Sequence, residues 1–343
     1  MTFHIELSTR DGQPLSFDCT SEQNLLEAAA AANIILPAQC RQGSCGACQA
    51  SVTAGNYVLG PHNADALAHG HGAILMCRTT AQSDLRVTLP FDSSKILFHA
   101  VPRRIAEIIA IDTVAENTVR LELRLQTDAD CGSAAEFESG QFIEIEVPGS
   151  DQRRAYSLAN TGNWEGRLEF LIRLQPGGLF STFLRERAQL GMLLTVYGPQ
   201  GTFGIEASSL RPRWFVAGGT GLAPVLSILR RMAEFQELHE ARLFFGVNRE
   251  SELFALDELE RLKIELPQLK VEICVWRPEG DWRGFTGTPA EALQQALSQA
   301  AIQPDIYLCG PAPLVNAVET IAATYDLPKE QIFSERFLPA ATD

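Results

Sequence analysis

The chain has 343 residues, of which 45% are hydrophobic and 20% charged, enough for two or three ordinary globular domains. Its formal net charge of −14 argues against a nucleic-acid partner, because phosphate contacts require a basic face. No apolar run approaches a membrane span and the first residues lack the features of a signal peptide, so we expect a cytoplasmic protein with no membrane partner and with reduced thiols.

The first segment, residues 1–95, has the pattern of a small mixed domain. A turn at Asp11-Gly12 separates two short alternating runs, and a stretch rich in Leu and Ala follows Ser21. This pattern predicts strands at 3–7, 15–17 and 85–89 and a helix over 21–32.

Four cysteines in this segment have the spacing C-x4-C-x2-C followed much later by a fourth: Cys40, Cys45, Cys48 and Cys77. This is the plant-type ligand spacing of a [2Fe–2S] cluster, in which each iron takes two thiolates. Gly43 and Gly46 let the loop curl toward the sulfides and direct backbone N–H groups at them. The segment resembles the β-grasp of plant-type ferredoxins.

The alternatives are a zinc site, a disulfide framework and a Rieske cluster. Zinc sites favour paired C-x2-C units, and the second pair is missing here. A Rieske cluster needs two histidine ligands, and no histidine lies close in sequence to these cysteines. The spacing therefore favours a plant-type cluster, which holds one electron at a time.

A connector over about 91–102 leads to a second segment, residues 102–207, in which apolar and polar residues alternate. Alternation at 118–123, 143–147 and 168–172, with Gly, Pro and Asn between, predicts an antiparallel β-barrel. The third segment, residues 210–343, alternates apolar strands with helical stretches such as 223–235. Its strands at 214–217, 243–247, 271–276 and 305–309 predict a doubly wound parallel sheet with helices on both faces.

The third segment contains a glycine turn between its first strand and helix, formed by Gly218, Gly219, Thr220 and Gly221 and followed by Pro224. It is not the standard dinucleotide pattern, since Pro224 takes the place of the third glycine, but such a turn still brings a pyrophosphate close to a helix N-terminus. The alternative interpretation is that these glycines are required only for packing. Cys309 and Gly310 stand at a carboxyl strand end, where α/β sheets bind ligands, although a buried Cys often serves only as a small apolar side chain.

The strand that ends at Gly246 is followed by Arg249, Glu250 and Glu252, at the position where doubly wound folds contact the adenosine ribose. An acidic residue such as Glu250 bonds the 2′-hydroxyl and repels a 2′-phosphate, whereas Arg249 would attract one. The local charge therefore favours NADH, unless all three are ordinary solvated charges.

In the barrel segment, Arg154, Tyr156 and Ser157 resemble the R-x-Y-S flavin motif of the ferredoxin–NADP reductase family. An Arg can neutralise a pyrophosphate, a Tyr can pack on the ring system, and a Ser can hydrogen-bond near flavin N5. A second flavin motif of that family is matched by Gly177–Ser181, including Gly178 and Ser181, and its end-of-barrel turn by 198–203.

With these motifs, almost the whole chain resembles the three-domain NADH-dependent reductases of bacterial multicomponent oxygenases. The runs 165–173, 215–221 and 304–311 are most similar to soluble methane monooxygenase reductases, and the cluster loop also resembles benzoate-type dioxygenase reductases. The resemblance implies FAD as the flavin, a Cys309 near the nicotinamide, and an acidic and an aromatic residue at the flavin near the chain end. Phe337 is the candidate aromatic residue, with a role in the core as the alternative.

The resemblance also implies a function in alkane or aromatic hydrocarbon catabolism. NADH gives a hydride to FAD beside Ser157, Cys309 and Phe337, and single electrons pass through the [2Fe–2S] cluster to the oxygenase component of a diiron monooxygenase. A Rieske aromatic-ring-hydroxylating dioxygenase is the alternative acceptor. A non-oxygenase electron-transfer reductase, or a carrier whose flavin and nicotinamide segments are only structural, also remains open.

Overall fold

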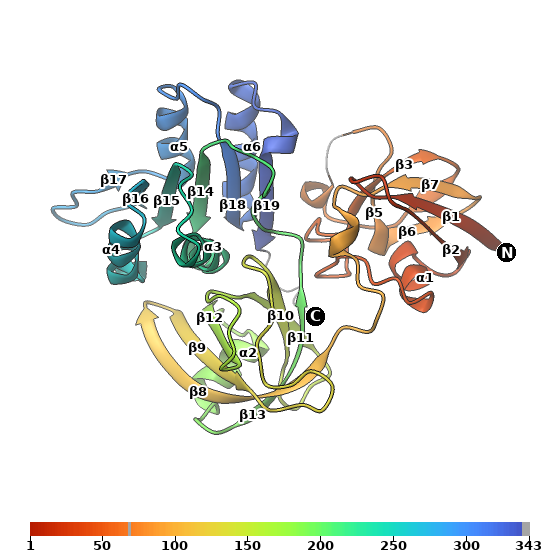
Figure 1. Ribbon diagram of the computed structural model, residues 1–343, viewed down its shortest axis with the longest axis horizontal. Helices are drawn as coiled ribbons and strands as arrows, with labels where there is room; N and C mark the ends of the chain where they lie inside the picture. The colour runs from red at the N-terminus through yellow and green to blue at the C-terminus, as the bar shows by residue number, and fades with distance from the viewer. Residues whose placement is uncertain (68–69, 338–343) are drawn as a thin grey trace. The chain divides into compact units, whose positions relative to one another are not determined.

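The computed structural model describes residues 1–67 and 70–337, which form two compact units (Figure 1). Among the described residues, the first comprises Met1–Pro102 and Gln200–Thr202, and the second comprises Arg103–Pro199 and Phe203–Phe337. The last six residues of the expected third domain lie outside the described residues. Within the described part of the chain, no helix combines the length and apolar character that a membrane crossing requires.

The first unit is built on a five-stranded sheet in the order β2-β1-β7-β3-β5. β1 runs parallel to β7, and the other neighbours are antiparallel, as in a β-grasp. Ile5, Leu25 and Ile74 are fully buried in one core that joins the sheet to its helix. The elements are β1 (Thr2–Ser8), β2 (Pro14–Thr20), α1 (Leu25–Ala31), β3 (Gln49–Ala54), β4 (Tyr57–Leu59), β5 (Ala73–Leu75), β6 (Thr79–Ala81) and β7 (Leu85–Thr88).

The helix of this unit begins later than predicted, at Leu25 rather than near Ser21. Asn24 caps it: its side chain accepts a hydrogen bond from the N–H of Glu27 at 3.0 Å, and the Glu27 carboxylate accepts one from the N–H of Asn24 at 3.2 Å. This reciprocal capping box satisfies two donors that a helix start otherwise leaves unpaired. The cap therefore decides the boundary, which the Leu and Ala content alone did not reveal.

The second unit begins with a six-stranded antiparallel sheet in the order β11-β10-β13-β8-β9-β12. A bridge between Leu158 and Phe170 joins its two edges and closes it into a barrel. The predicted strands are present, and β8, β11 and β13 are additional. The elements are β8 (Arg103–Ala115), β9 (Thr118–Leu125), β10 (Phe142–Glu146), β11 (Arg153–Ser157), β12 (Arg167–Arg173), α2 (Leu179–Glu186) and β13 (Leu193–Gln200).

The rest of this unit is a parallel sheet in the order β17-β16-β15-β14-β18-β19. Helices α3 and α4 pack on one face, and α5 and α6 pack on the other (Figure 1). The doubly wound prediction is confirmed. The elements are β14 (Arg213–Gly218), α3 (Leu222–Glu234), β15 (Ala241–Val247), α4 (Leu256–Glu265), β16 (Leu269–Val275), β17 (Phe285–Thr286), α5 (Pro289–Leu297), β18 (Asp305–Pro311), α6 (Ala312–Thr324) and β19 (Ile332–Phe337).

The strand order of this sheet reverses between β14 and β18, because the chain moves outward in one direction from β14 and in the other from β18. The carboxyl ends of these two strands therefore form the topological switch point, where open α/β sheets bind ligands. The glycine turn after β14 is a 3₁₀ turn, Gly219–Gly221. The other 3₁₀ turns are Ala64–Ala66, Met76–Arg78, Ser93–Lys95, Glu250–Glu252 and Lys329–Gln331.

Candidate functional site

The four predicted cluster ligands lie together as two pairs. The thiol groups of Cys40 and Cys45 are within hydrogen-bond reach of each other, and so are those of Cys48 and Cys77. Cys77 also interacts electrostatically with both thiols of the first pair, so the pairs are neighbours. Among residues 1–67 and 70–337, no group of three or more metal-binding side chains is arranged to hold a single ion. Two neighbouring thiol pairs fit a two-iron cluster, in which each iron takes two thiolates.

The backbone of the cluster loop points N–H groups at sulfur. The N–H groups of Gln42 and Ser44 each lie 3.4 Å from Cys40 Sγ, and the N–H of Cys40 lies 3.4 Å from Cys45 Sγ. Such bonds stabilise thiolate charge and tune the reduction potential of an iron–sulfur site.

The two loop glycines are required by conformation and by space. Gly43 and Gly46 have φ angles of 76° and 78°, the left-handed region in which other residues are strained. A Cβ on Gly46 would lie 2.8 Å from the carbonyl oxygen of Ala66, and one on Gly43 would lie 2.7 Å from Cγ of Arg78. Contacts with Ala66 and Arg78 are therefore enough to explain these glycines, and the predicted approach of the loop to the sulfides stays a prediction.

The candidate flavin and nicotinamide residues meet at the switch point through Glu335. The Ser157 hydroxyl donates to Glu335 Oε2 at 3.1 Å, and the Cys309 thiol donates to the same oxygen at 3.8 Å. Ser157 ends β11 of the barrel, whereas Cys309 and Glu335 are register partners on β18 and β19. Both donors are buried, so the carboxyl group holds together side chains from two domains.

The protonation of this cluster follows from its burial. Burial raises the pKa of Glu335 to about 7, although the hydrogen bonds from Ser157 and Cys309 lower it. Burial and the nearby Glu335 raise the pKa of the Cys309 thiol well above its ordinary value, so the thiol stays neutral. A carboxyl group with a pKa near neutrality can gain or release a proton at physiological pH, which is useful beside a redox centre.

The other flavin candidates lie near this point on the barrel. The ring of Tyr156 lies 5.4 Å from that of Phe180 on α2, so the two flavin motifs are in contact. The Ser181 hydroxyl accepts a hydrogen bond from the N–H of Gln175 at 2.9 Å, and Gly178 caps the start of α2. Arg154 donates to Gln152 Oε1 at 2.5 Å and to the carbonyl oxygen of Arg153 at 2.9 Å. These bonds use two of its five N–H donors.

The glycine turn after β14 has one tightly packed and one open position. A Cβ on Gly221 would lie 2.2 Å from the carbonyl oxygen of Cys309, so this glycine lets β14 approach β18. Gly219 has φ of 54° and open space where a Cβ would stand. A pyrophosphate could lie against this open backbone at the start of α3, where Thr220 and Pro224 also lie.

Three further predicted residues have structural partners. A Cβ on Gly246 would lie 2.2 Å from Cγ of Pro289, so packing against α5 is enough to explain that glycine. The Glu250 carboxylate accepts from the N–H of Glu279 at 2.9 Å. Phe337 is half-buried and packs on the core of α3 and β18. The roles of these residues at NADH or flavin stay predictions.

Sequence reasoning did not single out Glu335 as a site residue. The expectation of an acidic residue near the chain end was the signal that could have found it. β19 was not predicted as a strand, and only its pairing with β18 brings Glu335 beside Cys309.

Models of three protein families match the chain, each within one of the expected domains. A 2Fe-2S iron-sulfur cluster binding domain matches residues 8–82, an oxidoreductase FAD-binding domain matches 106–205, and an oxidoreductase NAD-binding domain matches 215–320. The order of cofactor domains expected from the motifs is therefore confirmed, while their boundaries stay predictions.

Similar proteins cover nearly the whole chain. Methane monooxygenase component C of Methylosinus trichosporium is 38% identical over 86% of this chain and 87% of its own length. The toluate 1,2-dioxygenase electron transfer component of Pseudomonas putida is 33% identical over 99% of this chain and 100% of its own length. Among solved structures, an Amycolatopsis cytochrome P450 reductase has a TM-score of 0.75 at 27% identity and covers 98% of this chain and 100% of its own. The chain therefore belongs to the family of three-domain, NAD-binding flavin and [2Fe–2S] oxidoreductases that includes the electron-transfer components of bacterial oxygenases.

Proposed function

We propose that the chain oxidises NADH and delivers the electrons singly to the oxygenase component of a multicomponent diiron monooxygenase. The observation that carries this proposal is the junction of Ser157, Cys309 and Glu335 at the switch point, because it joins the flavin and nicotinamide domains where a hydride would pass. When bound, FAD supplies hydride acceptance followed by single-electron release, and the [2Fe–2S] cluster supplies one-electron transfer.

The residues of the junction have distinct tasks in this proposal. Ser157 places its hydroxyl beside the flavin while it donates its one proton to Glu335, and Cys309 bounds the nicotinamide position without ionising. Glu335, with a pKa of about 7, holds or releases the proton that accompanies reduction and reoxidation. Tyr156 would pack against the flavin ring, and Phe337 would cover the ring where the nicotinamide enters.

The binding residues around this junction position the two nucleotides. Arg154, Gly178 and Ser181 bind the flavin phosphates, and the open turn at Gly219 and Thr220 binds the pyrophosphate of NADH. Cys40 and Cys45 hold one iron of the cluster, and Cys48 and Cys77 hold the other.

The acceptor we favour is a diiron hydroxylase, because 38% identity to a methane monooxygenase component exceeds the 33% to a dioxygenase component. A Rieske dioxygenase is the second candidate, since the relative from the toluate system aligns with all but 1% of the chain. Net negative charge is compatible with either acceptor.

Reconstitution tests the proposal. The holoprotein is mixed with NADH and either a purified diiron hydroxylase or a purified Rieske oxygenase, each with its own substrate, and hydroxylated product is measured. We expect NADH-dependent product with the diiron hydroxylase. Product only with the Rieske oxygenase would support the alternative. Product with neither, while NADH still reduces ferricyanide, would indicate a non-oxygenase reductase, and loss of both would contradict the proposed oxidoreductase.

A further inference from the structure

We propose that Arg230 is a positioning residue that holds the nicotinamide domain against the flavin barrel at the separation required for hydride transfer. This inference rests on the proposed hydride transfer from NADH to FAD. It concerns a side chain on α3 that lies outside every motif identified in the sequence.

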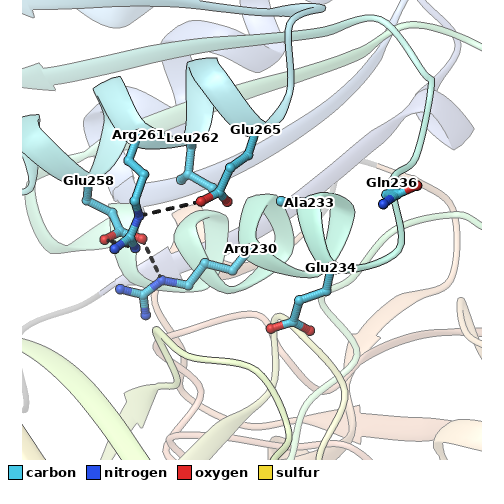
Figure 2. Close-up of a pocket in the computed structure, with 8 residues that line it drawn as sticks. All are labelled: Arg230, Ala233, Glu234, Gln236, Glu258, Arg261, Leu262 and Glu265. Carbon is cyan, nitrogen blue, oxygen red and sulfur yellow. Dashed lines mark hydrogen bonds and ion pairs between the residues drawn. The ribbon is translucent and has the colours of Figure 1, made fainter.

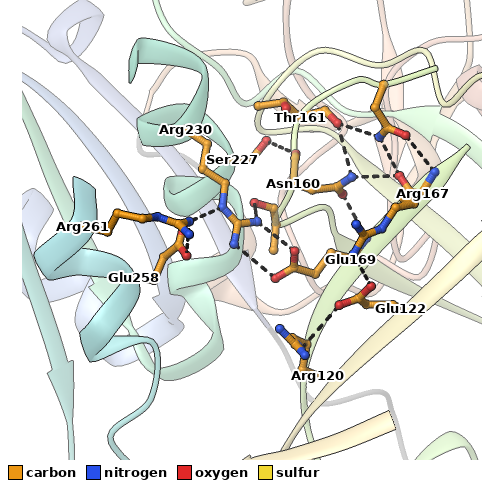
Figure 3. Close-up of polar contacts among 12 residues, drawn as sticks. Arg120, Glu122, Asn160, Thr161, Arg167, Glu169, Ser227, Arg230, Glu258 and Arg261 are labelled. Carbon is orange, nitrogen blue, oxygen red and sulfur yellow. Dashed lines mark hydrogen bonds and ion pairs between the residues drawn. The ribbon is translucent and has the colours of Figure 1, made fainter. Parts of the chain in front are cut away.

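Arg230 binds both domains at once (Figure 3). Toward the barrel, its Nη1 donates to the carbonyl oxygen of Ala159 at 3.0 Å and to Glu169 Oε2 at 2.9 Å, while Nη2 lies 3.4 Å from Glu169 Oε1. Toward its own domain, Nε donates to Glu258 Oε1 on α4 at 2.9 Å. The planar guanidinium group thus clamps a barrel carboxylate with one edge and an α4 carboxylate with the other.

The same face of α3 makes two further bonds to the barrel. The Ser227 hydroxyl donates to the carbonyl oxygen of Asn160 at 2.6 Å, and the Thr161 hydroxyl donates to Glu234 Oε1 at 2.6 Å. Residues 227, 230 and 234 follow one another on one side of a helix. Arg230 is the central and only cationic member of this row, so it forms the charged part of the contact.

The position of Arg230 along α3 connects this contact to the chemistry. The helix begins at Leu222, directly after the glycine turn, and Arg230 lies eight residues later, about 12 Å along the axis. A tilt of α3 by about 5° would displace its start by roughly 1 Å, and a misplacement of that size can cost about 100-fold in rate.

On the barrel, the groups that Arg230 binds are connected to the residue placed at the flavin. Ala159 lies two residues after Ser157 and donates its N–H to the carbonyl oxygen of Glu169 at 2.8 Å. The carboxylate and the carbonyl oxygen that Arg230 binds therefore belong to two paired segments, one of which carries the serine placed at the flavin. Arg230 thus couples the helix behind the nicotinamide turn to the strand end beside the flavin.

The electrostatic setting makes this contact testable without leaving an unpaired buried charge. The side chains of Arg230, Glu169 and Glu258 are 21%, 14% and 16% exposed. Removing the charge of either glutamate leaves Arg230 paired with the other.

A pocket between α3 and α4 with a volume of about 430 Å³ borders the arginine (Figure 2). It is lined by Arg230, Ala233, Glu234, Gln236, Glu258, Arg261, Leu262 and Glu265.

This symmetry supplies a matched pair of variants. Glu169→Gln removes the charge that crosses between the domains, and Glu258→Gln removes the charge within the nicotinamide domain. Arg230→Lys keeps the positive charge but loses the planar set of N–H donors that binds both carboxylates at once. Arg231→Ala is a second control, because Arg231 lies on the same helix but pairs with Glu237 of its own domain. All are made in the full-length holoprotein.

Flavin reduction by NADH is followed by stopped flow, and FAD content, the dissociation constant of NADH and hydrogen exchange over 159–161 are measured as well. We expect Glu169→Gln and Arg230→Lys to slow reduction at saturating NADH by about tenfold or more, while NADH affinity changes by less than about threefold. Exchange over 159–161 should rise. Glu258→Gln and Arg231→Ala should stay within about twofold of wild type.

Equal rates for Glu169→Gln and Glu258→Gln would overturn the inference. So would a lower melting temperature of Glu169→Gln without slower reduction of its bound flavin, because that is the behaviour of a residue that only stabilises the fold. If Glu169→Gln does not fold, Arg230→Lys decides by the same criteria. A wild-type protein whose flavin NADH does not reduce would instead refute the proposed function.

Discussion

Glu335 gives the protein a pH-dependent stability that a single isosteric substitution should remove. Burial holds its pKa at about 7 against an ordinary value of 4.5. Below about pH 4.5 the carboxyl group is protonated in both the folded and the unfolded chain, and its contribution to stability is fully present. As the pH rises toward 7, the unfolded chain releases this proton while the folded chain retains it, so unfolding becomes more favourable.

The size of the effect follows from the shift. A change from 4.5 to about 7 corresponds to about 3 kcal/mol, since one pKa unit is worth about 1.4 kcal/mol. Glu335→Gln keeps the shape and can still accept the hydrogen bonds of Ser157 and Cys309, but it does not titrate. The free energy of unfolding of this variant, minus that of wild type, should therefore grow by about 3 kcal/mol between pH 4.5 and 7.5 and then level off.

The assay is urea unfolding of flavin-free protein, so that unfolding is not linked to flavin release. Tryptophan fluorescence isolates the relevant unit, because all four tryptophans lie in it: Trp164, Trp214, Trp276 and Trp282. Ser334→Ala, at an exposed position of the same strand, is the control and should differ from wild type by an amount that does not change with pH. An equally flat difference for Glu335→Gln would refute the reasoning, because Glu335 would then be ionised in the folded protein at neutral pH.

Three further predictions concern the cofactors. Cys77→Ser should remove the cluster but leave flavin content and NADH-driven ferricyanide reduction largely intact, and simultaneous loss of flavin would contradict the separation of the domains. Arg154→Ala should weaken FAD binding by about tenfold to 100-fold in an equilibrium titration, because a charge-assisted bond to the pyrophosphate is lost; unchanged affinity would exclude that contact. NADH should be preferred over NADPH in kcat/KM for ferricyanide reduction, because Glu250 repels a 2′-phosphate. Equal or better use of NADPH would assign Arg249 to phosphate binding.

The cluster and the cofactor turns could be predicted because their chemistry constrains short stretches of sequence. Three ligands of the cluster lie within one nine-residue loop, and the spacing alone restricts which metal group they can hold. Likewise, the glycine turn before α3 has Gly218, Gly219 and Gly221 within four residues, and Gly221 lets the backbone approach β18. Local geometry of this kind depends on residues that are close together in the sequence.

Elements stabilised mainly by partners distant in the chain were harder to predict. β13 pairs with the distant β8 and was not expected. β8 was also missed, although its longer pairing is with β9, the next strand in the chain. β19 is a parallel edge strand that depends on β18 for its hydrogen bonds. The start of α1 was misplaced for a different reason, since a capping box at Asn24 outweighed helix-forming composition.

The sequence by itself determined the three kinds of domain, their order and the candidate ligands of the cluster, because each depends on periodicity or on spacing along a short stretch of chain. Only the tertiary structure decided how the second and third domains share a site. Ser157 and Glu335 are 178 residues apart, yet their side chains lie at 3.1 Å. Arg230 and Glu169 are 61 residues apart and form an ion pair at 2.9 Å. No local pattern encodes such contacts, because they exist only after the barrel has closed and the parallel sheet has added its last strand.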